Sequence, residues 1–259
     1  MIDLHSHILP GIDDGPKSLD ESIALAHAYA NAGFKQIVAT PHWISGTAWT
    51  PTPQDIQQKV SVFKQALKDH QLDMTISQGM EIAFDIDIDS LFEQKKILSL
   101  AGGPYVLIES PFQRFPMGWE QIFFRIISKG FKILLAHPER CDQLIGDPSF
   151  TENIIGTGVY IQVNCDSFLG GYGKYIQKTA VTLAEKGHIH CLATDSHDAV
   201  HRRPANFSES LAIVEKLIGK KNTHKIAFEN PKRVLSGADL VVPEPIKRAG
   251  SRKKRGKSW

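Results

Sequence analysis

The chain has 259 residues, of which 42% are hydrophobic, 22% charged and 8% aromatic. This composition excludes disorder throughout the chain and suits one large α/β domain or two small ones. Seven of the 30 basic residues, and none of the 28 acidic ones, follow residue 245, so the formal net charge of +2 combines an acidic body of net charge −5 with a basic tail.

The cysteine count and the apolar runs exclude further classes of protein. Cys141, Cys165 and Cys191 contain no C-x-x-C pair and are too few for a disulfide scaffold. The apolar runs fall far short of the ~20 residues that span a bilayer, and the N-terminus lacks the regions of a signal peptide. We therefore expect a reduced, cytoplasmic protein without a transmembrane segment.

Seven short apolar runs rich in Ile, Val and Leu are typical of strands in a parallel sheet that is covered on both faces. In chain order they are residues 2–4, 36–39, 74–79, 105–108, 132–136, 159–163 and 191–193.

Helical patterns separate most of these runs. Ser18 is placed to cap a helix that ends near Gly33, and Thr52 followed by Pro53 begins a second helix that runs to about residue 70. Four further helices are predicted over residues 85–100, 119–129, 175–186 and 206–218, the first of them less regular than the others.

Strand followed by helix about seven times predicts an α/β fold, either a barrel or a doubly wound sheet. No linker divides residues 1–245, which we expect to form a single domain. Residues 246–259 lack apolar periodicity and are predicted to be a disordered basic tail.

Six of the seven apolar runs are followed by His, Glu or Asp, and the remaining run ends in Asn164. The C-terminal ends of the strands of an α/β barrel meet on one face, where active sites are built. The side chains of metal-ligand type at these ends and in the first loop are His5, His7, Asp14, His42, Glu81, Glu109, His137, Asp195 and His197.

Each of these side chains taken alone has a structural alternative, as a hydrogen-bonded histidine or a capping carboxylate. Their joint placement has no structural requirement behind it, and nine ligands are too many for one tetrahedral ion. The pattern therefore predicts two or three divalent metal ions that share a carboxylate, an arrangement suited to phosphoryl transfer.

Five motifs carry a resemblance to the polymerase-and-histidinol-phosphatase (PHP) superfamily over residues 1 to about 235. They are Ile-Asp-Leu-His-Ser-His at 2–7, Asp-Asp-Gly-Pro at 13–16, Thr-Pro-His at 40–42, Ala-His-Pro-Glu-Arg at 136–140 and Asp-Ser-His at 195–197. The form His-Ile-Leu-Pro-Gly-Ile-Asp-Asp-Gly-Pro at 7–16 is similar to the bacterial protein-tyrosine phosphatases that accompany capsule and exopolysaccharide tyrosine kinases.

The resemblance implies a distorted (β/α)7 TIM-like barrel that holds three metal ions, with manganese most expected and iron, zinc or cobalt as alternatives. The implied ligand sets are His5, His7, Glu81 and Asp195 for one ion, Glu81, Glu109 and His137 for the second, and Asp14, His42 and His197 for the third. The resemblance also assigns phosphate contacts to Arg140 and to an arginine after His197, for which Arg202 and Arg203 are both candidates.

The resemblance implies hydrolysis of a phosphate monoester by a metal-bound hydroxide, with a phosphotyrosine protein, an autophosphorylating bacterial tyrosine kinase, as substrate. Aromatic side chains in the loops could stack on the phosphotyrosine ring or pack on the barrel; they are Trp43, Trp49, Phe112, Phe115 and Trp119. A cysteine mechanism is rejected because His197, and not an arginine, stands six residues after Cys191.

Three alternatives remain open at the level of sequence. One is a phosphoesterase for a small molecule such as histidinol phosphate. Another is a metal-dependent amidohydrolase, although that family usually has a lysine where Glu81 and Glu109 stand. The third is a non-catalytic protein whose basic tail binds an anionic surface, with a membrane a better partner than nucleic acid.

Overall fold

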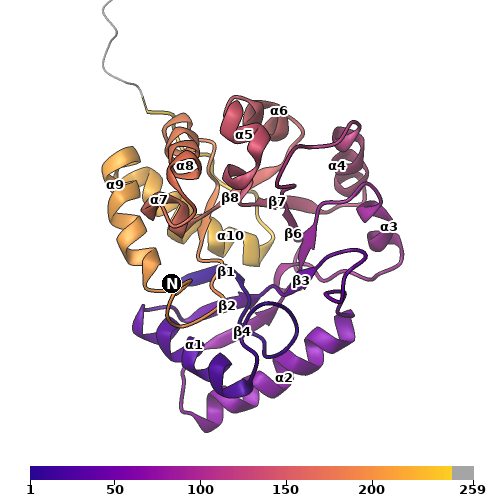
Figure 1. The fold of residues 1–259 in the computed structure, drawn as a ribbon, viewed down its shortest axis with the longest axis vertical. Coiled ribbons are helices and arrows are strands. Elements are labelled where there is room, and N and C mark those ends of the chain that lie inside the picture. The colour runs from indigo at the N-terminus through magenta and orange to yellow at the C-terminus, as the bar shows by residue number, and fades with distance from the viewer. Residues whose placement is uncertain (247–259) are drawn as a thin grey trace, which may run out of the picture.

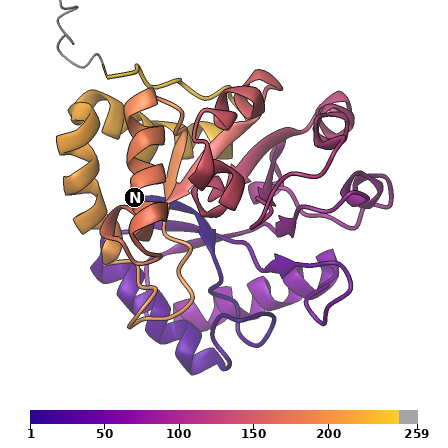
Figure 2. The same ribbon diagram turned by 45° about the horizontal axis from the view of Figure 1, so that its top comes forward.

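The structure, a computed structural model, describes residues 1–246 and has parallel strands at its centre with helices around them (Figures 1 and 2). The strands are β1 Ile2–Ser6, β2 Gln36–Ala39, β3 His42–Trp43, β4 Thr75–Gln78, β5 Glu81–Ala83, β6 Tyr105–Glu109, β7 Lys132–Ala136, β8 Tyr160–Asn164 and β9 Cys191–Ala193.

Each of the seven predicted strand regions is followed by at least one helix. The α-helices are α1 Leu19–Asn31, α2 Pro53–Asp69, α3 Ile88–Glu93, α4 Trp119–Ser128, α5 Asp142–Gly146, α6 Phe150–Gly156, α7 Cys165–Leu169, α8 Lys174–Lys186, α9 Asn206–His224 and α10 Asn230–Ser236. Shorter turns of other helix types are η1 Leu100–Gly102, η2 Pro138–Arg140 and the π-helical η3 Lys225–Glu229.

Every strand pairs in parallel, within two sheets of order β1-β2-β4 and β3-β5-β6-β7-β8-β9. The ends of the two sheets meet where Ser6 forms a β-bridge with Ser196 and the N–H of Asp195 donates to the carbonyl of His5 at 3.0 Å. The α/β class and the single domain are confirmed. The hydrogen bonds do not close one cylinder, so the (β/α)7 barrel stays a prediction.

The second and third apolar runs each continue into a short strand of the other sheet. Pro41 interrupts the first continuation because proline has no N–H for a ladder, and Gly79 lies in the second. As a result His42 and Glu81 open β3 and β5, where they pair directly with each other. The sequence had placed these two residues after strands, whereas the structure places them at the start of strands.

Local sequence signals account for several of the helix ends. Thr52 and Asp55 form a capping box at the start of α2, and Gly187 ends α8 in the left-handed conformation. The helix predicted over residues 85–100 is wrong in its extent, since only α3 and η1 form there. The predicted end at residue 218 agrees with the backbone, because Gly219 has φ of 77° and ψ of 158°, outside the helical region, and the rest of α9 follows this break.

Side chains on the inner face of several strands are apolar in the middle of the strand and polar near its C-terminal end. Leu107 belongs to a small apolar cluster with Leu134 and Cys191, and Glu109 lies two residues further along the same strand face. A larger apolar cluster lies between the strands and the helices. The interior is therefore apolar at depth and polar at the C-terminal strand ends.

Two expectations concern membranes and the tail. Within residues 1–246 no helix combines the length and the hydropathy that crossing a membrane requires. The predicted disordered tail, residues 246–259, falls outside the described part of the chain except for Ile246, whose N–H donates to the carbonyl of Glu185 at 2.8 Å.

Candidate metal centre and active site

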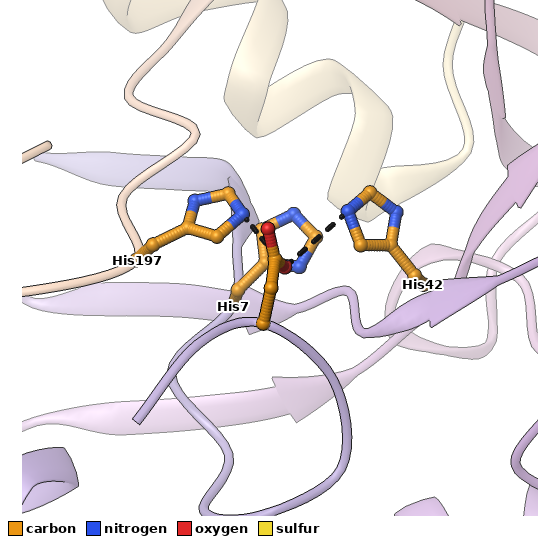
Figure 3. Close-up of side chains that lie close together, drawn as sticks. His7, His42 and His197 are labelled. Carbon is orange, nitrogen blue, oxygen red and sulfur yellow. Dashed lines mark ion pairs between the residues drawn. The ribbon is translucent and has the colours of Figure 1, made fainter. Parts of the chain in front are cut away.

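The nine side chains predicted as metal ligands converge in space, although His42 and Glu81 open strands and Asp14 lies in the loop after β1. They form four overlapping groups whose ligand atoms lie within 4.8 Å of one another. The groups are His7, Asp14, His42 and His197; His5, His7 and Glu81; His5, His137 and Asp195; and His42, Glu81 and Glu109. Figure 3 shows His7, His42 and His197 turned toward one another. These groups differ from the implied sets in three ways: His7 joins Asp14, His42 and His197; His137 groups with His5 and Asp195; and His42 replaces His137 beside Glu81 and Glu109.

Backbone strain turns two of these side chains into the site. His137 follows β7 with φ of 35°, and Asp195 follows β9 with φ of 54°. Residues other than glycine seldom adopt this left-handed region, and those that do cluster at functional sites because the surrounding structure must hold them there. Two of the five non-glycine residues with positive φ in the described chain thus lie in the candidate site, and the other three, Gln71, Lys95 and Ala101, lie outside it.

The loop after β1 supplies Asp14 and holds a carboxylate behind the site. Asp13 accepts from the N–H of His42 at 3.1 Å and lies 2.8 Å from Nδ1 of His7. The turn requires glycine at position 15, because a Cβ there would lie 2.1 Å from the carbonyl oxygen of His7. Asp13 thus orients the imidazole of His7, whose Nε2 is left toward the site, and holds the backbone of His42; outer carboxylates orient metal-binding imidazoles in the same way.

The donor set fits divalent metal ions. Oε2 of Glu81 lies 2.8 Å from Nδ1 of His42, and Oδ1 of Asp14 lies 3.1 Å from Nε2 of His197. All four atoms are buried, yet none makes a hydrogen bond of acceptable geometry. Buried polar atoms that converge without hydrogen bonds need another partner, and imidazole nitrogen with carboxylate oxygen suits Mn, Fe, Co and Zn.

The carboxylates of the site differ in their acidity. Burial opposes ionisation of Glu81, but His5 and His42 overcome it and hold the pKa of this carboxyl well below its ordinary value. Burial and the neighbouring Glu81 raise the pKa of Glu109 to about 7. Ionised Glu81 and Glu109 would repel each other in one buried space, and a bound cation would relieve this repulsion.

The predicted arginines occupy different positions. Nη1 of Arg140 lies 3.5 Å from Oδ2 of Asp195, and Nη2 of Arg202 lies 3.3 Å from Oδ2 of Asp14. Nε of Arg203 instead donates to Oδ1 of Asn206 at 3.1 Å, away from the ligands. Arg140 and Arg202 line the cavity over the nine ligands and Arg203 does not.

This cavity has a volume of about 190 Å³ and two aromatic walls. Trp49 stacks on His42 with a centroid separation of 5.5 Å, and Phe112 lies on the His137 side at 6.5 Å. The other three aromatic candidates do not line the cavity: Phe115 and Trp119 are packed in the core, and Trp43 lies against it.

The guanidinium of Arg140 contacts two aromatic rings. Its carbon is 5.0 Å from the centroid of Phe112 and 4.7 Å from that of Tyr172. Tyr172 has little local sequence signal, since it is only an aromatic residue within Gly-Gly-Tyr-Gly at 170–173. Its hydroxyl is buried without a hydrogen-bond partner. The ring, and not the hydroxyl, therefore makes the contact with Arg140.

The cysteines lie outside this chemistry. All three are free and buried, and Cys191 belongs to β9 within the small apolar cluster. Burial raises the pKa of the Cys191 thiol, which disfavours the thiolate that a nucleophile requires. The structure agrees with the rejection of a cysteine mechanism.

A parallel α/β sheet with histidines and carboxylates converging at its C-terminal edge, and with arginines above them, defines a metal-dependent hydrolase of the phosphoesterase type. The comparisons with known proteins agree. Tyrosine-protein phosphatase YwqE of Bacillus subtilis is 30% identical over 96% of this chain and 97% of its own length. Tyrosine-protein phosphatase CpsB of Streptococcus pneumoniae is 30% identical over 91% and 98%, respectively.

The chain belongs to the capsular polysaccharide synthesis family CpsB/CapC, whose family model matches residues 1–236. A crystal structure described as one of the "unique metal-dependent tyrosine phosphatases" YwqE and CpsB matches with a TM-score of 0.89 and 30% identity, over 96% of this chain and 100% of that one. The lactonase Lmo2620 of Listeria monocytogenes, at 11% identity, 92% coverage of this chain and a TM-score of 0.55, shares the fold alone. The resemblance drawn from the motifs is confirmed.

Proposed function

We propose that this chain is a metal-dependent protein-tyrosine phosphatase that removes phosphate from an autophosphorylating bacterial tyrosine kinase of capsule or exopolysaccharide synthesis. The observation that carries the proposal is the convergence of nine ligand side chains beneath a cavity that Arg140 and Arg202 line. The names of the relatives favour a phosphotyrosine protein over a small phosphate ester such as histidinol phosphate.

We propose two to three divalent ions at this site, with manganese first and iron, zinc or cobalt as alternatives. When bound, such ions lower the pKa of water and neutralise charge on the phosphoryl oxygens. The chain's own residues bind and orient the substrate. Arg140 and Arg202 would donate N–H groups to the non-bridging oxygens and add fixed positive charge around the transition state.

The leaving group of an aryl phosphate determines whether the site needs a general acid. Phenolate is a fairly good leaving group, so a strong general acid is not required beside it. Trp49 and Phe112 would flank the phenyl ring at the cavity walls, at a small additional gain from aromatic contact. These two side chains are the proposed source of the preference for an aryl phosphate.

Metal analysis and a substrate panel test the proposal together. We expect the purified protein to retain two to three divalent ions and to give a higher kcat/KM for phosphotyrosine peptides than for phosphoserine peptides or histidinol phosphate. Trp49→Leu should lower kcat/KM for an aryl phosphate more than for an alkyl phosphate, so the alkyl substrate is the internal control. A preference of the unaltered protein for histidinol phosphate would contradict the proposed substrate.

We propose a cytoplasmic location, which suits three free cysteines, and contact of the basic tail with an acidic surface such as the membrane leaflet beside the kinase. Deletion of residues 247–259 should leave hydrolysis of a small aryl phosphate unchanged and abolish sedimentation with anionic vesicles. Equal sedimentation of both proteins would rule out the tail contact.

A further inference from the structure

Two buried amide side chains on β8 lie directly beneath the candidate metal centre. Gln162 and Asn164 are both inaccessible to solvent and, two residues apart on one strand, share a face. Oε1 of Gln162 lies 2.9 Å from Nδ1 of His5, and Nε2 of Gln162 donates to Oδ1 of Asn164 at 2.8 Å. Nδ2 of Asn164 donates to Oδ2 of Asp195 at 2.7 Å. We call these three hydrogen bonds, from His5 to Asp195, the amide chain.

The carboxylate end decides the direction of every bond in the amide chain. An ionised carboxylate can only accept, so Asn164 must present its NH2 group to Asp195. Its Oδ1 then faces Gln162, which must present its own NH2 group. Oε1 of Gln162 is left facing His5, which must donate from Nδ1. Nε2 of His5 is therefore the unprotonated nitrogen, as a metal ligand must be.

The same chain orients Asp195. Because Oδ2 accepts from Asn164, the other oxygen, Oδ1, faces the histidines, 3.4 Å from Nε2 of His5 and 3.3 Å from Nε2 of His7. The two ends of the chain thus place one lone pair of His5 and one of Asp195 toward the same point. His5 and Asp195 also belong to one of the four candidate metal groups.

The backbone of β8 is held in place from the neighbouring strand region. Oε1 of Glu139 accepts from the N–H of Asn164 at 3.0 Å and from the hydroxyl of Ser167 at 2.6 Å. The N–H of His137 donates to the carbonyl of Gln162 at 2.8 Å. The amide chain is therefore anchored to the segment that carries both a candidate ligand and Arg140.

We propose that Gln162 and Asn164 are positioning residues that preset the tautomer of His5 and the carboxylate orientation of Asp195 for the metal ion these two ligands share. Partners behind metal ligands typically contribute about 10- to 100-fold in metal affinity. The inference concerns retention of the metal and does not depend on which phosphate ester is the substrate.

Removal of either amide tests the proposal. Gln162→Met and Asn164→Leu keep most of the side-chain volume and break the amide chain, so each should weaken binding of Mn²⁺ about 10- to 100-fold in competition with a chelator. With Co²⁺ bound, each should also alter the visible absorption spectrum of the site. The matched control is Val163→Ala, which perturbs packing on the other face of β8 and should keep unaltered metal affinity and spectrum.

The double variant separates one connected chain from two independent contacts. If the amide chain acts as a unit, Gln162→Met with Asn164→Leu should lose little more affinity than the more damaging single variant. If the fold loss in metal affinity of the double variant equals the product of the two single losses, the two amides act independently and the amide chain is refuted. If the single variants bind the metal as tightly as Val163→Ala does, the positioning role is refuted. Thermal unfolding of the metal-free proteins checks folding. If Asn164→Leu does not fold, Asn164→Ser, which cannot reach Asp195, replaces it with the same expected loss.

Discussion

The aromatic clamp on Arg140 leads to a prediction whose size follows from the structure. We define the aromatic clamp as the rings of Phe112 and Tyr172, which lie 5.0 and 4.7 Å from the guanidinium carbon. The side chain of Arg140 is 20% exposed, so each cation–π contact belongs in the upper part of the usual range, about 1 to 2 kcal/mol.

Tyr172→Leu removes one ring of the aromatic clamp. If the clamp holds Arg140 in its working orientation, the loss of about 1 to 2 kcal/mol in transition-state stabilisation corresponds to a decrease of about 5- to 30-fold in kcat/KM. The assay is steady-state hydrolysis of a small aryl phosphate by metal-saturated protein, which avoids contributions from peptide binding.

Tyr172→Phe is the matched control, because it keeps the ring and removes only a buried hydroxyl that has no hydrogen-bond partner. Removing an unsatisfied polar group should leave kcat/KM near that of the unaltered protein and leave stability unchanged or slightly increased. An equal decrease in both variants would show that the hydroxyl, and not the ring, matters. Unchanged kcat/KM in Tyr172→Leu would refute the clamp itself.

Three further predictions follow from the site and the core. Arg202→Ala should lower kcat/KM at least about tenfold, whereas Arg203→Ala, which removes the adjacent guanidinium outside the cavity, should not; equal effects would contradict the assignment of the phosphate contact. Cys191→Ser should retain phosphatase activity that a chelator abolishes, and the reverse result would refute the metal mechanism. Burial lowers the pKa of His190 to about 4, below its ordinary value of 6.5. Its neutral form therefore contributes about 3 kcal/mol to the free energy of unfolding above pH 6.5, and this contribution is lost as the pH falls toward 4. Urea unfolding of metal-free protein should show about 2 kcal/mol of this loss between pH 7 and pH 5, and His190→Asn should reduce it. An unchanged pH dependence in the variant would exclude His190 as the cause.

The strained backbone at two strand ends and the amide chain both lie beside the candidate metal ligands. His137 and Asp195 adopt left-handed backbone conformations that cost of order 1–3 kcal/mol each. Gln162 and Asn164 add buried polar groups to a strand that would otherwise be apolar, and such groups are tolerated only when their hydrogen bonds are made. Both features lie at the candidate metal ligands, where the proposed gain in orientation would offset their cost.

Much of the site could be predicted from local patterns. Residues of metal-ligand type after successive apolar runs predicted a metal centre, because parallel strands bring their C-terminal ends to one face. All nine candidates meet there. The helix starts at Ser18 and Thr52 could also be predicted, because a cap acts on amides within the next three residues.

Other features were decided only by the tertiary structure. The pairing of His42 with Glu81 in register depends on where two strands break. The choice between Arg202 and Arg203 depends on which guanidinium reaches Asp14, a residue far away in the sequence; Arg202 does, whereas Arg203 bonds Asn206. Tyr172 reaches Arg140, and Asn164 reaches Asp195, across about 30 residues of chain.

Sequence alone therefore determined the candidate site residues and the face on which they meet, since periodicity and capping are local. Which of their atoms face one another, and which side chains orient them, depends on contacts between distant segments. No local pattern encodes these contacts, because they exist only once the strands have paired and the core has packed.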